Sequence, residues 1–256
     1  MKKKIYFIAT IYDPIHIFLK PYINNLQNEY EIIIICNLEN NFFKKSKYFK
    51  YIHLNLPRNP NFVLDTVSFF RLIIIFIFNR PYKIISITPK SGFLCTLISR
   101  ILFIDNIHFI TGQVWQTNTK ILYRKFLKFI DKIIGNFSHK VIVDSKPQYK
   151  YLFKNKIVNH RANFFNSVSG IDLQSIKKNN FKKELFKKGY NIHKNSFGLI
   201  YVGRINHDKG INDLIEIYLN LKKKLKNKIY LIIVGEDEIN FFRQNLSSIL
   251  KKNQIF

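Results

Sequence analysis

The residues best suited to chemistry lie in one short loop of the C-terminal part of the chain, between Gly203 and Gly210. Within this loop, Arg204 and Lys209 place two cations between a strand-like run that ends at Val202 and a helix-like run that follows. In an open parallel sheet, ligands bind beyond the carboxyl ends of the strands, where loops meet helix N-termini. Glycine allows close backbone approach, and the positive end of a helix favours anions. The loop therefore predicts a binding site for a diphosphate.

The same loop has a simpler interpretation, which is a surface turn whose two cations are solvated. Spacing alone leaves both interpretations open. The glycine pattern does distinguish the loop from two familiar phosphate sites. It lacks the GxxxxGK[ST] spacing of a P-loop and the GxGxxG pattern of a dinucleotide-binding turn.

The elements that must position this loop alternate between strand-like and helix-like runs. Continuous Ile and Val runs are typical of parallel strands covered on both faces, and their alternation with helices predicts a doubly wound, Rossmann-like α/β sheet. The expected strands cover residues 5–10, 32–36, 51–54, 83–87, 107–111 and 141–143. The expected helices cover residues 15–28, 62–79, 93–103, 121–134 and 147–153.

A Lys- and Asn-rich stretch with little periodicity interrupts this alternation and predicts a linker over residues 176–195. We therefore expect a Rossmann-like N-terminal domain in residues 1–175 and a second one in residues 196–256. In the second, the expected elements are residues 197–202, 211–225, 229–234 and 239–250. An open parallel sheet of about 60 residues is small for a domain, so we expect this one to be incomplete.

The composition limits the classes of protein that remain. Of 256 residues, 47% are hydrophobic, which is enough for a packed core and excludes general disorder. The formal net charge of +26 favours anionic partners, although lysines that simply fill solvated positions explain it equally well. Cys36 and Cys95 stand in apolar contexts without metal-ligand spacing and predict buried free thiols in a reducing compartment.

Neither a targeting segment nor a membrane span is predicted. The N-terminus has a signal peptide's positive charge, but Asp13 and Pro14 end its apolar run early. The most apolar stretch, residues 69–78, contains Arg71 and is shorter than the roughly 20 residues that a spanning helix needs. A cytoplasmic location is expected.

Several motifs together resemble a known family. Residues 201–211 (YVGRINHDKGI) are similar to the VGR…KG signature that opens the nucleotide-sugar domain of retaining, family-4 glycosyltransferases of the GT-B type. LIIVGE at 231–236 and NSVSGIDL at 166–173 resemble two further segments of the same family, and they occur in the same order along the chain as in the family. TPKSG at 88–92 and ITGQVW at 110–115 resemble stretches of a subgroup that acts in bacterial surface-polysaccharide assembly. Their shared order favours the ligand-binding interpretation of the loop over the solvated turn.

The resemblance implies a hexosyl-type glycosyltransferase that moves a sugar from a nucleotide-diphosphate donor to a lipid-linked or glycan acceptor, without a metal or other cofactor. It implies that the N-terminal domain is the acceptor side and that the C-terminal domain binds the nucleotide sugar. Arg204 and Lys209 are the implied catalytic residues, since fixed charges stabilise a departing diphosphate. The implied substrate-binding residues are Gly203, Gly210, Gly235, Thr111, Gly112, Gln113, Trp115, Ser169 and Gly170.

The chain departs from the family pattern at two places. Where many members carry a His after the strand expected at 107–111, this chain has Thr111, and His108 within the strand is expected to be a core residue. The family's E-x7-E pair would lie beyond Phe256, so we expect a truncated chain. The alternative function is therefore a non-catalytic remnant or an acceptor-domain subunit. Trp115 either stacks on a sugar or lies in the core.

Residues 120–134 predict an amphipathic helix with apolar side chains on one face and basic ones on the other. Such a helix lies on an anionic membrane surface, here the inner face of the plasma membrane, or packs its apolar face on the sheet. Nucleic-acid binding is the remaining alternative. The even spread of lysines and the lack of a helix-turn-helix, zinc or RNA-recognition motif oppose it.

Overall fold

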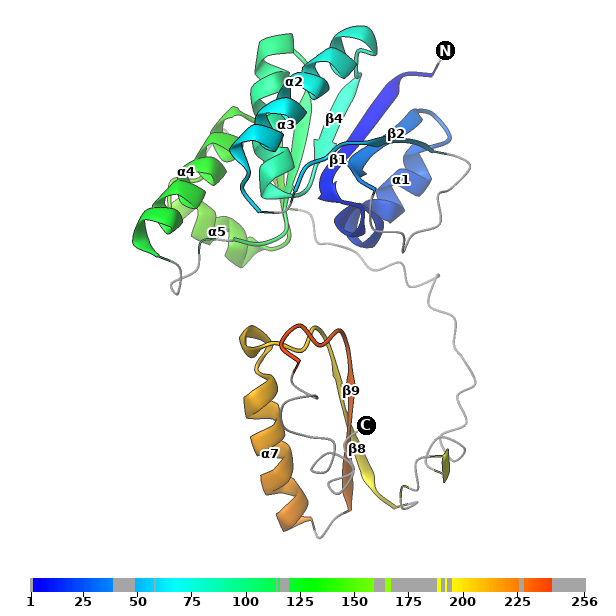
Figure 1. Ribbon diagram of the computed structural model, residues 1–256, viewed down its shortest axis with the longest axis vertical. Coiled ribbons are helices and arrows are strands. Elements are labelled where there is room, and N and C mark those ends of the chain that lie inside the picture. Colours follow the sequence, from blue (N-terminus) through cyan, green and yellow to red (C-terminus); the bar gives the residue numbers. More distant parts are fainter. Residues whose placement is uncertain are drawn as a thin grey trace. The chain divides into compact units, whose positions relative to one another are not determined.

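The computed structural model describes residues 2–38, 49–57, 59–113, 115, 120–158, 164–166, 188–189, 192, 195–225 and 228–240. The chain divides into two compact units, Met1–Ser175 and Ile176–Phe256 (Figure 1). The predicted linker at residues 176–195 lies mostly outside the described residues.

Unit 1 is built on a seven-stranded parallel sheet with the order β3-β2-β1-β4-β5-β6-β7. The strands are β1 (Lys4–Ile11), β2 (Glu31–Asn37), β3 (Lys50–His53), β4 (Lys83–Ser86), β5 (Asn106–Ile110), β6 (Lys140–Val143) and β7 (Phe164–Asn166). The order changes direction at β1, which pairs with β2 on one side and β4 on the other. This arrangement confirms the predicted doubly wound sheet. The three-residue edge strand β7 was not predicted, because so short a run carries no hydrophobic pattern of its own.

Helices cover both faces of this sheet. They are a π-helical turn η1 (Ile15–Leu19) that runs into α1 (Lys20–Leu26), then α2 (Phe62–Phe78), α3 (Pro89–Leu102), α4 (Ile121–Phe137) and α5 (Lys146–Lys154). Helix α3 begins four residues before its predicted start, because Thr88 and Ser91 form a reciprocal capping box and Pro89 occupies the first turn. Figure 1 shows α1 on one face of the sheet and α2 and α3 on the other.

Strand β1 shows how the two faces are filled. Tyr6 and Ile8 belong to the cluster that packs against α2 and α3, whereas Ile5, Phe7 and Ala9 belong to the cluster against η1 and α1. Successive side chains of a strand point to opposite faces, so a continuous apolar run supplies both cores.

The two cysteines lie in these two cores, one on each side of the sheet. Cys95 belongs to the cluster with α2 and α3, and Cys36 to the cluster with η1 and α1. Both are buried free thiols, as predicted, and burial raises the pKa of Cys36 to about 12. Neither thiol is therefore a thiolate at neutral pH.

The described residues of unit 2 form a βαβ unit of two parallel strands with a helix between them. Strand β8 (Phe197–Val202) pairs with β9 (Ile229–Val234), and the intervening helix α7 (Ile211–Lys224) packs on them through a core around Tyr218 and Leu231. These elements confirm three of the four predicted runs. The fourth, residues 239–250, lies largely outside the described residues.

Within the described part of the chain, no helix combines the length and the apolar character needed to cross a membrane. Nor does this part bring together three or more His, Cys, Asp or Glu side chains in a group able to hold a metal ion.

Candidate functional site

The loop that follows β8 is held against the loop that follows β9. The backbone N–H of Gly203 donates to the carbonyl of Val234 (2.9 Å), and that of Ile205 donates to the carbonyl of Glu236 (2.8 Å). The parallel ladder thus continues beyond both strands, and the first half of the predicted phosphate loop has a fixed backbone position.

Two of the predicted glycines are required by this geometry. A Cβ atom on Gly235 would overlap the carbonyl oxygen of Gly203, so only glycine lets the two loops approach this closely. Gly210 has a φ of 70°, in the left-handed region, where it ends a 3-10 turn (η3, His207–Lys209) and precedes α7. Both glycines therefore shape the loop through the backbone.

The two predicted catalytic cations are presented differently. Arg204 Nη1 lies 2.7 Å from Glu238 Oε1, in an ion pair that is about half exposed on the arginine side. The side chain of Lys209 is exposed, and its backbone N–H donates to Asn206 Oδ1 (3.1 Å). The loop therefore offers one guanidinium held in an ion pair and one exposed ammonium to an anion.

Glu238 and Asn206 are site residues that the sequence did not reveal. The second carboxylate oxygen of Glu238 accepts a hydrogen bond from Asn206 Nδ2 at 2.7 Å. This contact joins residues 32 positions apart. It becomes visible only once the pairing of β8 and β9 sets the two loops side by side.

Helix α7 begins directly after Gly210 without a side-chain cap. A helix whose first N–H groups have no side-chain cap presents partial positive charge at its N-terminus. Asp213 lies in this first turn and offsets part of that charge. Within unit 2, the structure thus brings together Gly203, Arg204, Lys209, Gly210 and Gly235 around one helix end, an arrangement suited to anion binding.

In unit 1, the predicted residues Thr111, Gly112 and Gln113 follow the carboxyl end of β5. Thr111 and Gly112 are exposed, as expected for a loop at the ligand-binding edge of a parallel sheet. Gln113 Nε2 is buried and finds no hydrogen-bond partner among the described residues. A buried donor without a partner costs free energy, so this amide stands out among the polar groups of the described part of the loop.

Trp115 lies in the core of unit 1. Its side chain is only 7% exposed, and its Nε1 donates to Asp131 Oδ2 at 2.7 Å. The indole stacks on Tyr151 at 5.5 Å, and Lys128 Nζ lies 5.2 Å from the ring centroid. Burial of this side chain supports the interpretation that Trp115 is a core residue over the interpretation that it stacks on a sugar.

His108 is a core residue, as predicted. Its Nδ1 lies 2.9 Å from Ser86 Oγ, and full burial lowers the pKa of the imidazole to about 3. The ring packs so tightly on α3 that a Cβ atom on Gly92 would collide with it. His108 is thus a neutral packing residue at neutral pH.

The TPKSG stretch lies where the strand order reverses, between β1 and β4. Thr88 Oγ1 accepts from the backbone N–H of Thr10 (3.0 Å), and Ser91 Oγ donates to the carbonyl of Ile8 (3.2 Å). Such a reversal is the usual ligand-binding position of doubly wound sheets. Here these hydroxyls join α3 to β1.

The remaining predicted residues, Ser169 and Gly170, lie outside the described residues.

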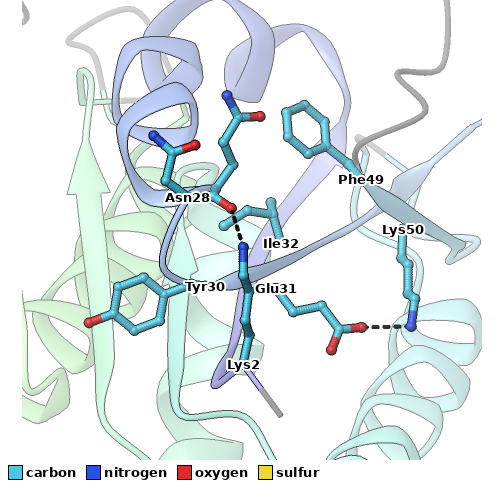
Figure 2. A pocket seen from close by; sticks show the side chains of 8 residues that line it. Lys2, Asn28, Tyr30, Glu31, Ile32, Phe49 and Lys50 are labelled. Atoms are coloured by element: carbon cyan, nitrogen blue, oxygen red, sulfur yellow. Dashed lines mark hydrogen bonds and ion pairs between the residues drawn. The ribbon is translucent and has the colours of Figure 1, made fainter.

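A separate hollow lies at the opposite edge of the sheet, where the strands begin (Figure 2). Its charged side chains are engaged within the protein: Lys50 Nζ lies 2.6 Å from Glu31 Oε1, and Lys2 Nζ donates to the carbonyl of Gln27 (3.2 Å). Because ligands of parallel sheets bind at the carboxyl edge, this hollow is not the predicted site.

Comparison with known proteins agrees with the geometry of the loop. Residues 182–256 match the family described as "Glycosyl transferases group 1". The chain is 26% identical over 208 residues to the capsular polysaccharide biosynthesis glycosyltransferase CapM of Staphylococcus aureus, an alignment that covers 74% of this chain and 52% of CapM. It is 29% identical over 136 residues to the uncharacterized glycosyltransferase MJ1069 of Methanocaldococcus jannaschii, covering 52% of this chain and 33% of that protein. The chain thus spans about half of one curated relative and a third of the other.

Solved structures show the fold. The sucrose-phosphate synthase of Thermosynechococcus elongatus matches with a TM-score of 0.70 at 14% identity, covering 100% of this chain and 70% of that chain. Alr3699/HepE of Anabaena, in complex with UDP and glucose, matches with a TM-score of 0.71 at 12% identity, covering 100% of this chain and 68% of that chain. The fold is that of GT-B glycosyltransferases. This confirms the predicted fold class.

Proposed function

We propose that this chain is a retaining, family-4 type glycosyltransferase that uses a nucleotide-diphosphate sugar in the biosynthesis of a cell-surface polysaccharide. One observation carries the proposal. Arg204 and Lys209 lie in a loop whose backbone is hydrogen-bonded to the end of β9 and to the loop that follows it. This loop leads into the start of α7, which has no side-chain cap. This loop falls within the segment that matches glycosyl transferases group 1.

Charge development explains why these two cations would matter. When the bond between the sugar's anomeric carbon and the diphosphate oxygen breaks, its electron pair remains on the diphosphate. The acceptor hydroxyl oxygen forms the new bond to the anomeric carbon, and its proton passes to an oxygen of the departing diphosphate. Fixed positive groups next to the leaving diphosphate stabilise it more as the bond breaks, which lowers the barrier. Arg204 supplies a forked contact and Lys209 a point charge, so no resident metal is required.

A nucleotide diphosphate as the donor is supported by structural neighbours. Anabaena HepE was solved with UDP and with UDP-glucose, and its fold matches this chain. We assign the donor side to unit 2 and the acceptor side to the loop of Thr111, Gly112 and Gln113 in unit 1, with Ser169 and Gly170 as further contacts. A lipid-linked or glycan acceptor is in keeping with the similarity to CapM.

We further propose that α4 rests on an anionic membrane surface. Part of the predicted apolar face of this helix is exposed: Leu122, Phe126 and Phe129 are 82%, 52% and 58% exposed, whereas Ile130 and Ile133 on the same face are partly buried. The fully buried residues of the helix are Asp131, Ile134 and Gly135. Exposed lysines, Lys125 and Lys132, interleave with the exposed apolar side chains, as in helices that lie at a lipid interface.

The membrane proposal is tested by co-sedimentation with vesicles that contain phosphatidylglycerol. Lys125→Glu combined with Lys132→Glu should abolish binding, because both lysines are exposed on the proposed contact. Lys223→Glu combined with Lys224→Glu changes the charge equally on α7 and should leave binding intact. Equal binding by both pairs, or none by wild type, contradicts the membrane proposal.

The enzymatic proposal is tested by thermal shift with UDP, GDP and uridine, followed by a transfer assay with the nucleotide that binds. A diphosphate should raise the melting temperature and uridine should not. Arg204→Ala should lower the turnover number by about 100-fold, as for other groups that stabilise transition-state charge. No shift with any diphosphate, or near-normal turnover in the variant, would contradict the proposal.

A further inference from the structure

The carboxylate of Glu238 is the point at which the phosphate loop is joined to the loop after β9. One of its oxygens contacts Arg204 Nη1 at 2.7 Å, and the other accepts from Asn206 Nδ2 at 2.7 Å. A single carboxylate therefore holds two side chains of the phosphate loop at once.

Asn206 extends this connection to the second cation. While its Nδ2 donates to Glu238, its Oδ1 accepts from the backbone N–H of Lys209 at 3.1 Å and so caps the 3-10 turn. Glu238 thus restrains Arg204 directly and the backbone of Lys209 through Asn206.

We propose that Glu238 is the positioning residue of the diphosphate site. This inference rests on the proposed function of the loop. An arginine has five N–H donors, and Glu238 engages Nη1, so the guanidinium keeps donors for phosphate oxygens. A long, half-exposed side chain otherwise loses much rotamer freedom when it binds a ligand. By fixing Arg204 beforehand, Glu238 removes part of that entropic cost from donor binding.

The negative charge of Glu238 suggests an alternative role, in which the carboxylate repels the anionic ligand. Glu238 is an anion beside a site for an anion, so electrostatics alone predict that its removal tightens nucleotide binding. Positioning predicts the reverse. The sign of the change in affinity therefore distinguishes the two roles.

Glu236 provides a matched control. It carries the same charge in the same loop and is exposed, and the structure assigns its side chain no hydrogen bond or ion pair within the described residues. Its removal changes the charge as Glu238→Ala does, but it leaves the contacts to Arg204 and Asn206 in place.

The test is calorimetric titration of the full chain with UDP, GDP and inorganic pyrophosphate. Glu238→Ala should weaken binding of the nucleotide that wild type prefers by about fivefold to tenfold, in line with the loss of charged hydrogen bonds. Glu236→Ala should leave the affinity unchanged or raise it slightly. In an Arg204→Ala background, Glu238→Ala should have a much smaller effect, because the guanidinium that it positions is absent.

The outcomes separate this inference from the proposed function. If wild type binds the nucleotide while Glu238→Ala binds it equally well or more tightly, the positioning role is wrong and the proposed function stands. Equal weakening by Glu236→Ala would also overturn it. If wild type binds neither nucleotide nor pyrophosphate, both fail together. Matching thermal unfolding of the two variants shows that any weakening is local to the site.

Discussion

The carboxyl group of Asp131 should make unit 1 less stable as the pH rises. Asp131 is buried beneath Trp115, and this burial raises the pKa of its carboxyl to about 6, while the hydrogen bond from Trp115 opposes the change. The ordinary value is 3.8. The folded chain therefore holds a proton that the unfolded chain releases between about pH 4 and pH 6, and the free energy of unfolding falls through this window.

The size of the effect follows from the two pKa values. A difference of about two pH units, at about 1.4 kcal/mol for each, corresponds to about 3 kcal/mol. This stability is fully present below about pH 4 and is lost by about pH 7, where the ionised carboxylate is buried. Asp131→Asn keeps an oxygen that accepts from Trp115 Nε1 but cannot ionise. The variant should match wild type near pH 4 and exceed it by up to about 3 kcal/mol at pH 7.5.

Urea unfolding at a series of pH values measures this difference. Trp115 is the only tryptophan of the chain, so its fluorescence reports on unit 1 alone, and far-ultraviolet circular dichroism provides a second probe. The native fluorescence of wild type should itself titrate near pH 6, and that of the variant should not. A difference in stability that is constant from pH 4 to pH 8, or one that favours wild type at higher pH, would refute this account of Asp131.

Two glycine substitutions test close packing in the two units separately. Gly92→Ala should destabilise unit 1 by about 1–3 kcal/mol, since the new methyl group meets the ring of His108. Urea unfolding followed by Trp115 fluorescence measures this loss of stability. Unchanged stability would show that the ring moves aside. Gly235→Ala should weaken UDP binding by more than about tenfold, because its methyl group would overlap the carbonyl of Gly203 and separate the two loops. Titration calorimetry checks the second change, and wild-type affinity in that variant would show that the two loops need not lie in contact.

Most elements could be predicted from the sequence because the strands are continuous Ile and Val runs. Strand β2 (Glu31–Asn37) and helix α2 (Phe62–Phe78) lie within one or two residues of their predicted positions. The π-helical turn at Ile15–Leu19 was not predicted as such, since its apolar spacing resembles that of an ordinary helix. The local sequence pattern thus predicts whether a segment is a helix or a strand, but it does not predict whether a helical turn has α- or π-type hydrogen bonds.

The parts that depended on distant contacts could not be predicted. The periodicity of α4 shows an apolar face, but only its packing against α3 determines which residues of α4 are buried. The predicted phosphate loop was found from its local spacing of glycines and cations. Its link to Glu238 requires two loops to meet through the pairing of β8 and β9, which no local pattern records.

The central claim is that Arg204 and Lys209 hold the diphosphate of a nucleotide sugar. Titration calorimetry with UDP and GDP on wild type, Arg204→Ala, Lys209→Ala and the control Lys224→Ala tests it most directly, since Lys224 is an exposed cation at the far end of α7. We predict that wild type and the control bind one of the two nucleotides equally, and that each loop variant binds it at least about tenfold more weakly. Equal affinity in all four proteins would contradict the claim.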